Sequence, residues 1–169
     1  MTSRSELAED FLNKLGSLIG KPCWSFCGGE NTGSDIDLGF GRKIPRIVRL
    51  LNPYLTEEQK YYDAEIVLFI KCAWRLDSGD AVICGSTDSN IVGGPMLTGL
   101  RSIVWMAVES VKIERPAFDL TVRFKGDLML RISCDQTNVE DDYDNYSLHL
   151  TDKVYVVGAR GRISCEARG

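Results

Sequence analysis

The sequence predicts an α+β protein, mostly antiparallel β, in which an N-terminal helix packs on a sheet. Between residues 119 and 161, short segments alternate apolar and polar side chains, and turn residues separate them at Lys125-Gly126 and Thr151-Asp152. This alternation buries one face of each segment and is typical of successive antiparallel strands. A helical pattern near the N-terminus and a similarity between the two halves of the chain are the other two observations.

The similarity predicts two diverged copies of one β-rich unit. Asp35–Phe40 aligns with Asp119–Phe124, and Trp74–Leu76 aligns with Tyr146–Leu148. In each aligned pair the apolar residues fall at the same alternating positions, which places them on the same face of a strand. We therefore interpret the chain as an internal repeat.

A single domain of 169 residues is predicted to hold both copies. The first copy spans residues 1–88 and the second spans 96–168, with a turn-rich linker between them. Residues 42–63 have no counterpart of comparable length in the second copy, so they form an insertion in the first. Thr56 and Gln59 can cap a short helix within it, and we expect the insertion to cover one edge of the sheet.

The N-terminal helix is predicted from a capping box and an apolar stripe. Ser3 and Glu6 have the spacing at which each side chain bonds the other residue's backbone N–H. Apolar residues then recur at helical spacing and should lie on the sheet, namely Leu7, Phe11, Leu15, Leu18 and Ile19. Gly20 followed by Pro22 is expected to stop the helix.

In the rest of the first copy, residues 23–29 and 35–41 are expected to form a hairpin, with Ile36, Leu38 and Phe40 on one face. The most apolar stretch of the chain, residues 64–76, is interpreted as one central strand buried on both faces. A turn at Asp77–Asp80 should lead into another strand over 81–85.

In the second copy, residues 96–108 are predicted as a short helix or turn that runs into a strand. Two strands are expected around Arg115-Pro116, and the alternating segments between 119 and 161 follow them. Residues 161–169 complete the unit as a last strand and a short tail.

Composition and charge predict a folded protein that remains in the cytoplasm. Hydrophobic residues make up 44% and charged residues 26% of the chain, which is ordinary for a globular domain. No apolar run approaches the roughly 18 to 20 residues that span a bilayer, and the first ten residues are polar and acidic, unlike a signal peptide. The net charge of −4 argues against direct nucleic-acid binding and favours a basic partner.

No catalytic, metal or cofactor site is predicted. The six cysteines include no CxxC pair, and His149 is the single histidine, so a zinc site and a Ser-His-acid triad both lack their usual ligands and partners. The glycine-rich segment at Gly28–Asp35 lacks the lysine of a phosphate-binding loop, and a hairpin turn is the expected structure. We therefore do not expect an enzyme.

The most concentrated charge lies in residues 135–144, where there is no basic residue. The spacing of its acids is not that of an EF-hand calcium loop. Two interpretations stay open: a solvated loop without a role, or a surface that recognises a cationic partner through charge and aromatic contact. The second predicts partner-binding residues at Glu140, Asp141, Asp142, Tyr143, Asp144 and Tyr146.

The segment from Phe118 to Leu150 resembles small bacterial immunity proteins, which are encoded beside polymorphic or contact-dependent growth inhibition toxins. It has a strand that begins Asp-Leu, a phenylalanine before a Lys-Gly turn, another strand, and then an acidic loop with an aromatic residue flanked by asparagine. The resemblance covers mainly residues 97–168. It implies that the protein binds and neutralises a cognate protein toxin domain, and a nuclease with a basic surface suits the acidic loop.

Two other classes of function are compatible with the sequence. In the first, the two copies form a β-barrel that binds or converts a small molecule in a pocket lined by Trp24, Trp74 and Trp105, although core packing is the favoured explanation of each tryptophan. In the second, the chain is a structural or assembly subunit. The sequence specifies no oligomeric state.

Overall fold

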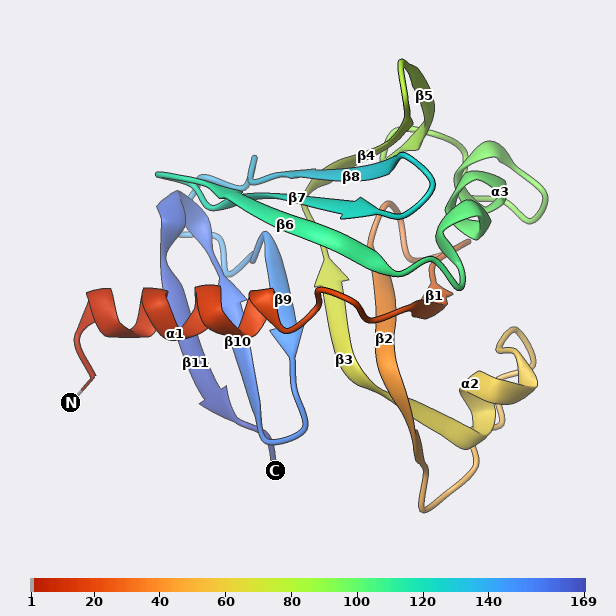
Figure 1. The fold of residues 1–169 in the computed structure, drawn as a ribbon, viewed down its shortest axis with the longest axis horizontal. Helices are drawn as coiled ribbons and strands as arrows, with labels where there is room; N and C mark the ends of the chain where they lie inside the picture. Colours follow the sequence, from red (N-terminus) through yellow and green to blue (C-terminus); the bar gives the residue numbers. More distant parts are fainter. Residues whose placement is uncertain (1) are drawn as a thin grey trace.

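The computed structural model describes residues 2–169 as two antiparallel sheets packed face to face, with an N-terminal helix along one side (Figure 1). This confirms the predicted α+β class with mostly antiparallel strands. Six strands form the first sheet, in the order β1-β2-β3-β9-β10-β11. Their bounds are β1 Cys23–Cys27, β2 Ile36–Pro45, β3 Tyr62–Ile70, β9 Tyr146–His149, β10 Lys153–Val157 and β11 Ile163–Ala167.

Five strands form the second sheet, in the order β5-β4-β8-β7-β6. Their bounds are β4 Ala73–Ser78, β5 Ala81–Gly85, β6 Val108–Glu114, β7 Asp119–Phe124 and β8 Leu128–Ser133. The helical segments are α1 Arg4–Gly16, α2 Glu57–Tyr61, α3 Pro95–Leu100, and the short 3₁₀ turns η1 Arg101–Ile103 and η2 Ala159–Gly161. Within residues 2–169, no helix combines the length and the hydropathy needed to cross a bilayer.

The two sheets have the same arrangement of strands, and each half of the chain contributes strands to both sheets. β1-β2-β3 lie beside β9-β10 in the first sheet, and β6-β7-β8 lie beside β4-β5 in the second. The pairing registers agree as well, because Leu68 pairs with Leu38 and Leu148, while Leu130 pairs with Val122 and Leu76. Two interlocked copies of a five-strand unit would produce this order; β11 has no equivalent in the second sheet, and the duplication itself stays a prediction.

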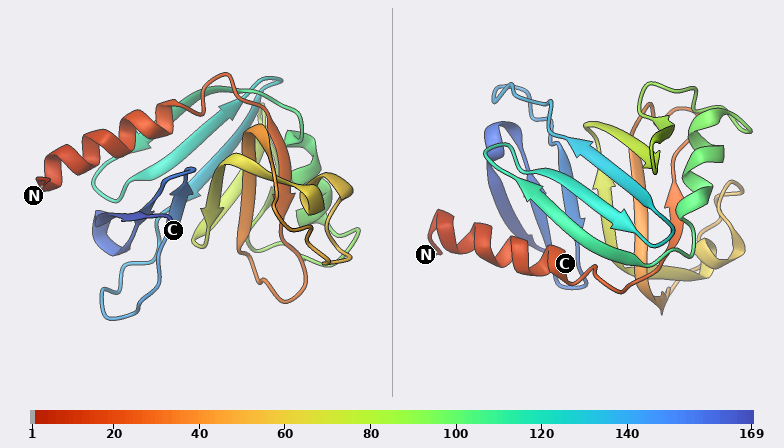
Figure 2. Two further views of the ribbon diagram at one scale, coloured as in Figure 1. Left: turned by 90° about the horizontal axis from the view of Figure 1, so that it is seen from below. Right: turned by 45° about the horizontal axis from the view of Figure 1, so that its top comes forward.

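The core lies between the two sheets, and the central strands β3, β7 and β8 bury every second side chain in it, as the alternation in the sequence predicts. Phe40 and Phe124 stack across the middle of the sandwich, with ring centroids 6.4 Å apart. α1 packs against the edge strands β6 and β11, and the second view shows it running beside both sheets (Figure 2). Its Phe11 is fully buried and contacts the rings of Tyr146 and Tyr155.

The N-terminal helix begins as the sequence predicts and ends earlier. Ser3 and Glu6 form the expected capping box, with Glu6 N–H 3.1 Å from Ser3 Oγ and Ser3 N–H 2.7 Å from a Glu6 carboxylate oxygen. α1 ends at Gly16, and a short turn continues the chain through the buried Leu18. Ile19 is 52% exposed, so it does not belong to the apolar stripe that packs on the sheet.

The prediction of one central strand over residues 64–76 is wrong. The stretch forms two strands, β3 and β4, which belong to different sheets. The chain crosses between the sheets at Lys71 and Cys72, whose backbone N–H groups both donate to the carbonyl of Asn145. Lys71 therefore interrupts an apolar run at the point where the chain leaves one sheet for the other.

The insertion is part hairpin and part loop. β2 extends to Pro45 and β3 begins at Tyr62, so residues 46–61 connect two paired strands. Thr56 and Gln59 form the predicted capping box at the start of α2. The Gln59 side chain then donates to the carbonyl of Phe26 on the edge strand β1, at 2.9 Å.

Candidate functional site

The acidic segment forms a loop between β8 and β9 whose two ends are tied together by Asn145. This side chain is fully buried: its Oδ1 accepts from Gln136 N–H at 2.9 Å, and its Nδ2 donates to the carbonyls of Gln136 and Gly158, both at 3.1 Å. Its backbone N–H donates to Val157. The ends of the loop are therefore held against the sheet, as in a compact Ω-loop.

The acids of this loop have no ionic partner. Glu140, Asp141 and Asp142 are exposed and Asp144 is half-buried, and none of the four forms an ion pair with any of residues 2–169. The acids elsewhere are often paired, as Glu65 is with Lys21 at 2.9 Å. The loop thus presents uncompensated negative charge to solvent.

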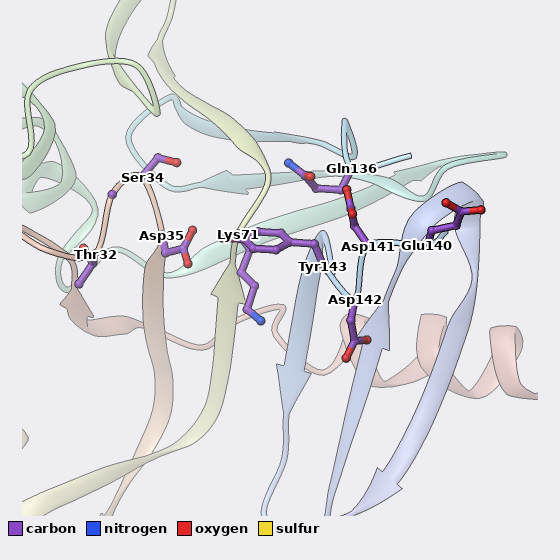
Figure 3. A pocket seen from close by; sticks show the side chains of 10 residues that line it. Thr32, Ser34, Asp35, Lys71, Gln136, Glu140, Asp141, Asp142 and Tyr143 are labelled. Atoms are coloured by element: carbon purple, nitrogen blue, oxygen red, sulfur yellow. The ribbon is translucent and has the colours of Figure 1, made fainter. Parts of the chain in front are cut away.

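An open pocket of about 660 Å³ separates the acidic loop from the turn that joins β1 and β2. Figure 3 shows Thr32, Ser34 and Asp35 on one side and the loop residues on the other, with Lys71 between them. The Lys71 ammonium lies 5.8 Å from the centroid of the Tyr143 ring, within cation–π distance. Burial raises the pKa of the Asp35 carboxyl, and the positive charge of Lys71 opposes that rise.

Four of the six predicted partner-binding residues line this pocket: Glu140, Asp141, Asp142 and Tyr143. Asp144 lies at the end of the loop beside Gly158. The predicted contact through Tyr146 is wrong, because its ring is 0% exposed and its hydroxyl donates to the carbonyl of Phe118 inside the core. Its alternation with Leu148 on an apolar strand already indicated an inward position.

The sequence did not predict Lys71, Asn145 and the β1–β2 turn as parts of this site. They are distant from the acidic segment in sequence, and only pairing of β3 with β9 brings Lys71 to the loop. The sequence position of Asn145 did indicate a hydrogen-bonding role, since a polar residue next to a buried strand needs hydrogen-bond partners.

The basic side chains of the insertion are neutralised within the fold. Lys43 lies 2.8 Å from Glu58, and the three arginines lie at longer distances from carboxylates. These pairs join Arg42 to Glu65, Arg46 to Asp63, and Arg49 to Glu57. The insertion therefore offers little of the unpaired positive charge that a phosphate backbone attracts.

His149 lies beside Ser147, but the hydroxyl of this serine is not accessible as a nucleophile. Its Nε2 is 2.8 Å from Ser147 Oγ, two residues along the same strand. Burial lowers the pKa of His149, which favours the neutral ring. Ser147 is only 8% exposed, so a substrate has little access to its hydroxyl. No group of three or more His, Cys, Asp or Glu side chains in the described chain is arranged to hold a metal ion.

The three tryptophans do not line one pocket, so that part of the small-molecule alternative is wrong. Trp74 is buried between the sheets, and its indole N–H donates to the carbonyl of Ser34 at 2.9 Å. Trp105 is 57% exposed. Trp24 is buried and lines a separate cavity on the other side of the first sheet from the core.

Comparison with known proteins identifies no relative of this chain. No family model, no curated protein and no solved structure matches it.

Proposed function

We propose that the protein is an immunity-type inhibitor, which binds a cognate toxin domain through its acidic loop and blocks a basic surface on that toxin. A nuclease is the toxin class that fits best, because a surface that binds phosphates is rich in Lys and Arg. Glu140, Asp141, Asp142 and Asp144 would meet these cations in place of phosphates. Tyr143 would supply the aromatic contact.

The observation that carries this proposal is the unpaired charge of the loop. Four acids lie within five residues, and none has an ionic partner in residues 2–169. Such a cluster attracts a basic partner over about 10 Å at moderate salt, and so accelerates its association. A partner that pairs with these acids would also relieve their mutual repulsion.

The anchored loop ends support the same proposal. Because Asn145 fixes both ends of the loop, less conformational entropy is lost when a partner orders the acids. Tyr143 is about half exposed, with one face near Lys71, so part of its ring is available for contact. An aromatic residue among charged neighbours is a common composition for a binding hot spot.

The test begins with capture of the toxin from cells that naturally produce both proteins, followed by inhibition of the purified toxin at equal molar ratio. A variant with Glu140→Gln, Asp141→Asn, Asp142→Asn and Asp144→Asn should bind at least about tenfold more weakly, since each substitution removes one charge pair. Its association rate should also depend less on salt than that of the native protein.

A matched control changes four exposed acids outside the loop: Glu9→Gln, Asp80→Asn, Glu109→Gln and Glu166→Gln. It makes the same change in net charge and should bind nearly as the native protein does. Equal affinity and equal salt dependence of the loop variant and the native protein would exclude the acidic loop as the contact. Capture of no toxin that the protein inhibits would reject the proposed function itself.

A further inference from the structure

Cys72 and Cys134 face each other across two neighbouring strands of the second sheet. The pairing of β4 with β8 places Ala73 opposite Ser133, and one step further along both chains Cys72 lies opposite Cys134. Opposed residues of an antiparallel pair point to the same face of the sheet. Here that face is the core, because Cys72 belongs to the core and Cys134 packs against it.

The backbone hydrogen bonds show that the two cysteines form a narrow pair. The N–H of Cys72 donates to the carbonyl of Asn145, which lies on neither neighbour of β4. The N–H of Cys134 donates at 2.6 Å to Asp119 on β7, the strand on the other side of β8 from β4. Neither N–H therefore bonds across the pair. The Cα atoms of such a pair lie about 4.5 Å apart, within the roughly 4.4–6.8 Å that a disulfide spans.

The two side chains are in contact as free thiols. They are hydrogen-bonded to each other, and this bond, together with burial, raises the pKa of Cys134. Cys72 is 1% exposed, whereas Cys134 is half-buried. A reagent in solution therefore reaches Cys134 first.

None of the other four cysteines, all within residues 2–169, has a cysteine opposite it. The residues opposite them are Phe40 for Cys23, Asp37 for Cys27, Leu76 for Cys84 and Tyr155 for Cys165. The strand register thus prepares one pair of thiols for a covalent bond.

We propose that Cys72 and Cys134 form a reversible disulfide when the protein meets a small-molecule disulfide such as oxidised glutathione. The Cys134 thiolate attacks a sulfur of this oxidant, whose S–S bond breaks and releases one small thiol. The Cys72 thiolate then attacks the Cys134 sulfur of the mixed disulfide and displaces the second small thiol. The two protein thiols lose two electrons and two protons, which convert the oxidant into two thiols.

This bond would join the two halves of the chain at the base of the acidic loop. Cys72 lies at the crossing between the sheets, and Cys134 directly follows β8, where the loop begins. The cross-link closes a segment of roughly 60 residues, so it should raise the melting temperature by about 10 °C. The inference is independent of the proposed toxin contact, because neither cysteine lines the pocket at the acidic loop.

The test uses the full chain with Cys165→Ser, which removes the exposed thiol and so prevents cross-links between molecules. The protein is unfolded in urea and refolded in glutathione buffers from fully reduced to fully oxidised, so that burial does not limit access of the reagent. Free thiols are then blocked, and trypsin releases Cys72 in the peptide 72–75 and Cys134 in the peptide 132–153. Mass spectrometry should find these two peptides linked at least about tenfold more often than any other cysteine pair, because proximity favours their reaction.

Cys134→Ser should abolish both the linked peptide and the rise in melting temperature, and a reducing agent should abolish that rise in the parent protein. Cys84→Ser is the matched control, since it removes another buried thiol and should leave the link unchanged. Circular dichroism checks that each variant is folded. Folded protein without the linked peptide after refolding in fully oxidised glutathione, or with another cysteine pair linked as often, would overturn the proposal.

Discussion

At the scale of single residues, Asp77 links two neighbouring strands of the second sheet. Its carboxylate accepts from Arg75 Nε at 2.8 Å on its own strand and from Arg131 Nε at 2.9 Å on β8. Hydrogen bonds from Arg75, and then from Arg131, lower the pKa of this carboxyl. Asp77 was predicted as a turn residue, and only the pairing of β4 with β8 shows its role.

The Asp77→Asn substitution should reduce the free energy of unfolding by about 1–2 kcal/mol at neutral pH, because three charge-assisted hydrogen bonds, two from Arg75 and one from Arg131, weaken or are lost. The folded-state pKa of Asp77 is below its unfolded value of about 3.9, so its contribution is complete above that pH. The contribution is lost as the pH falls through the folded-state pKa. The difference between variant and native protein should therefore shrink below about pH 4.

Urea denaturation at several pH values measures this difference. The Asp80→Asn variant is the control, since Asp80 is exposed and forms no ion pair with any of residues 2–169. If the difference in unfolding free energy between Asp77→Asn and the native protein stays constant down to strongly acidic pH, the stabilising role of the ionised Asp77 carboxylate is contradicted.

At the scale of elements, the acidic loop depends on a residue outside the acidic run. Asn145 makes three side-chain hydrogen bonds that join Gln136 at one end of the loop to Gly158 after β10. The acids themselves make no ion pair that would hold the loop in place, within residues 2–169. The buried amide of Asn145 therefore ties the ends of the loop, and a hydrogen bond from Arg160 Nε to the carbonyl of Thr137 at 3.2 Å adds a contact within it.

The Asn145→Ala substitution should cost about 1–2 kcal/mol of stability, because it leaves half-buried polar groups of Gln136 and Gly158 without partners. Amide hydrogen exchange in residues 136–144 should accelerate more than exchange in the strands, since the loop ends lose their connection. Denaturation and hydrogen-exchange mass spectrometry measure the two effects.

Asn138→Ala is the matched control, because Asn138 is exposed and its side chain bonds only the nearby Glu140 N–H. It should leave both stability and exchange close to native values. Unchanged exchange in the loop of Asn145→Ala would show that the loop is held by other contacts.

Element boundaries followed from local patterns wherever local chemistry defined them. The capping boxes at Ser3 and Thr56 begin α1 and α2 as predicted. Asp119–Phe124 coincides with β7. Asp35–Phe40 covers the first part of β2, which begins one residue later, at Ile36, and extends to Pro45. The prediction of one strand over residues 64–76 failed, because the apolar composition of this run does not show that the chain changes sheets at Cys72.

At the scale of the whole molecule, the two halves of the chain interlock. Strand pairs join the halves in both sheets, β3 with β9 in one and β4 with β8 in the other, and isolated bridges join Ile19 to Val108 and Pro22 to Ala107. Each half therefore has its strands divided between the two sheets. Neither half can close the core alone, since the facing apolar strands belong partly to the other half.

Fragments 1–92 and 93–169, divided in the exposed loop at Val92 and Gly93, should each be unfolded when alone. Mixed at equal concentration, they should associate into a folded complex, because the β3–β9 and β4–β8 pairs form again. Circular dichroism and size-exclusion chromatography measure both states. A fragment that folds as a monomer would contradict the interlocked arrangement as the source of stability.

The sequence by itself determined the fold class, the helix caps and the inward face of most strands, because these follow from residue spacing along a short stretch of chain. It also located the acidic segment, since charge density is a local property. Tertiary structure decided which strands share a sheet, that Tyr146 is buried, and that Lys71 and Asn145 belong to the acidic loop. It alone brought Cys72 and Cys134 to opposed positions on neighbouring strands, because these relations depend on contacts between strands distant in sequence.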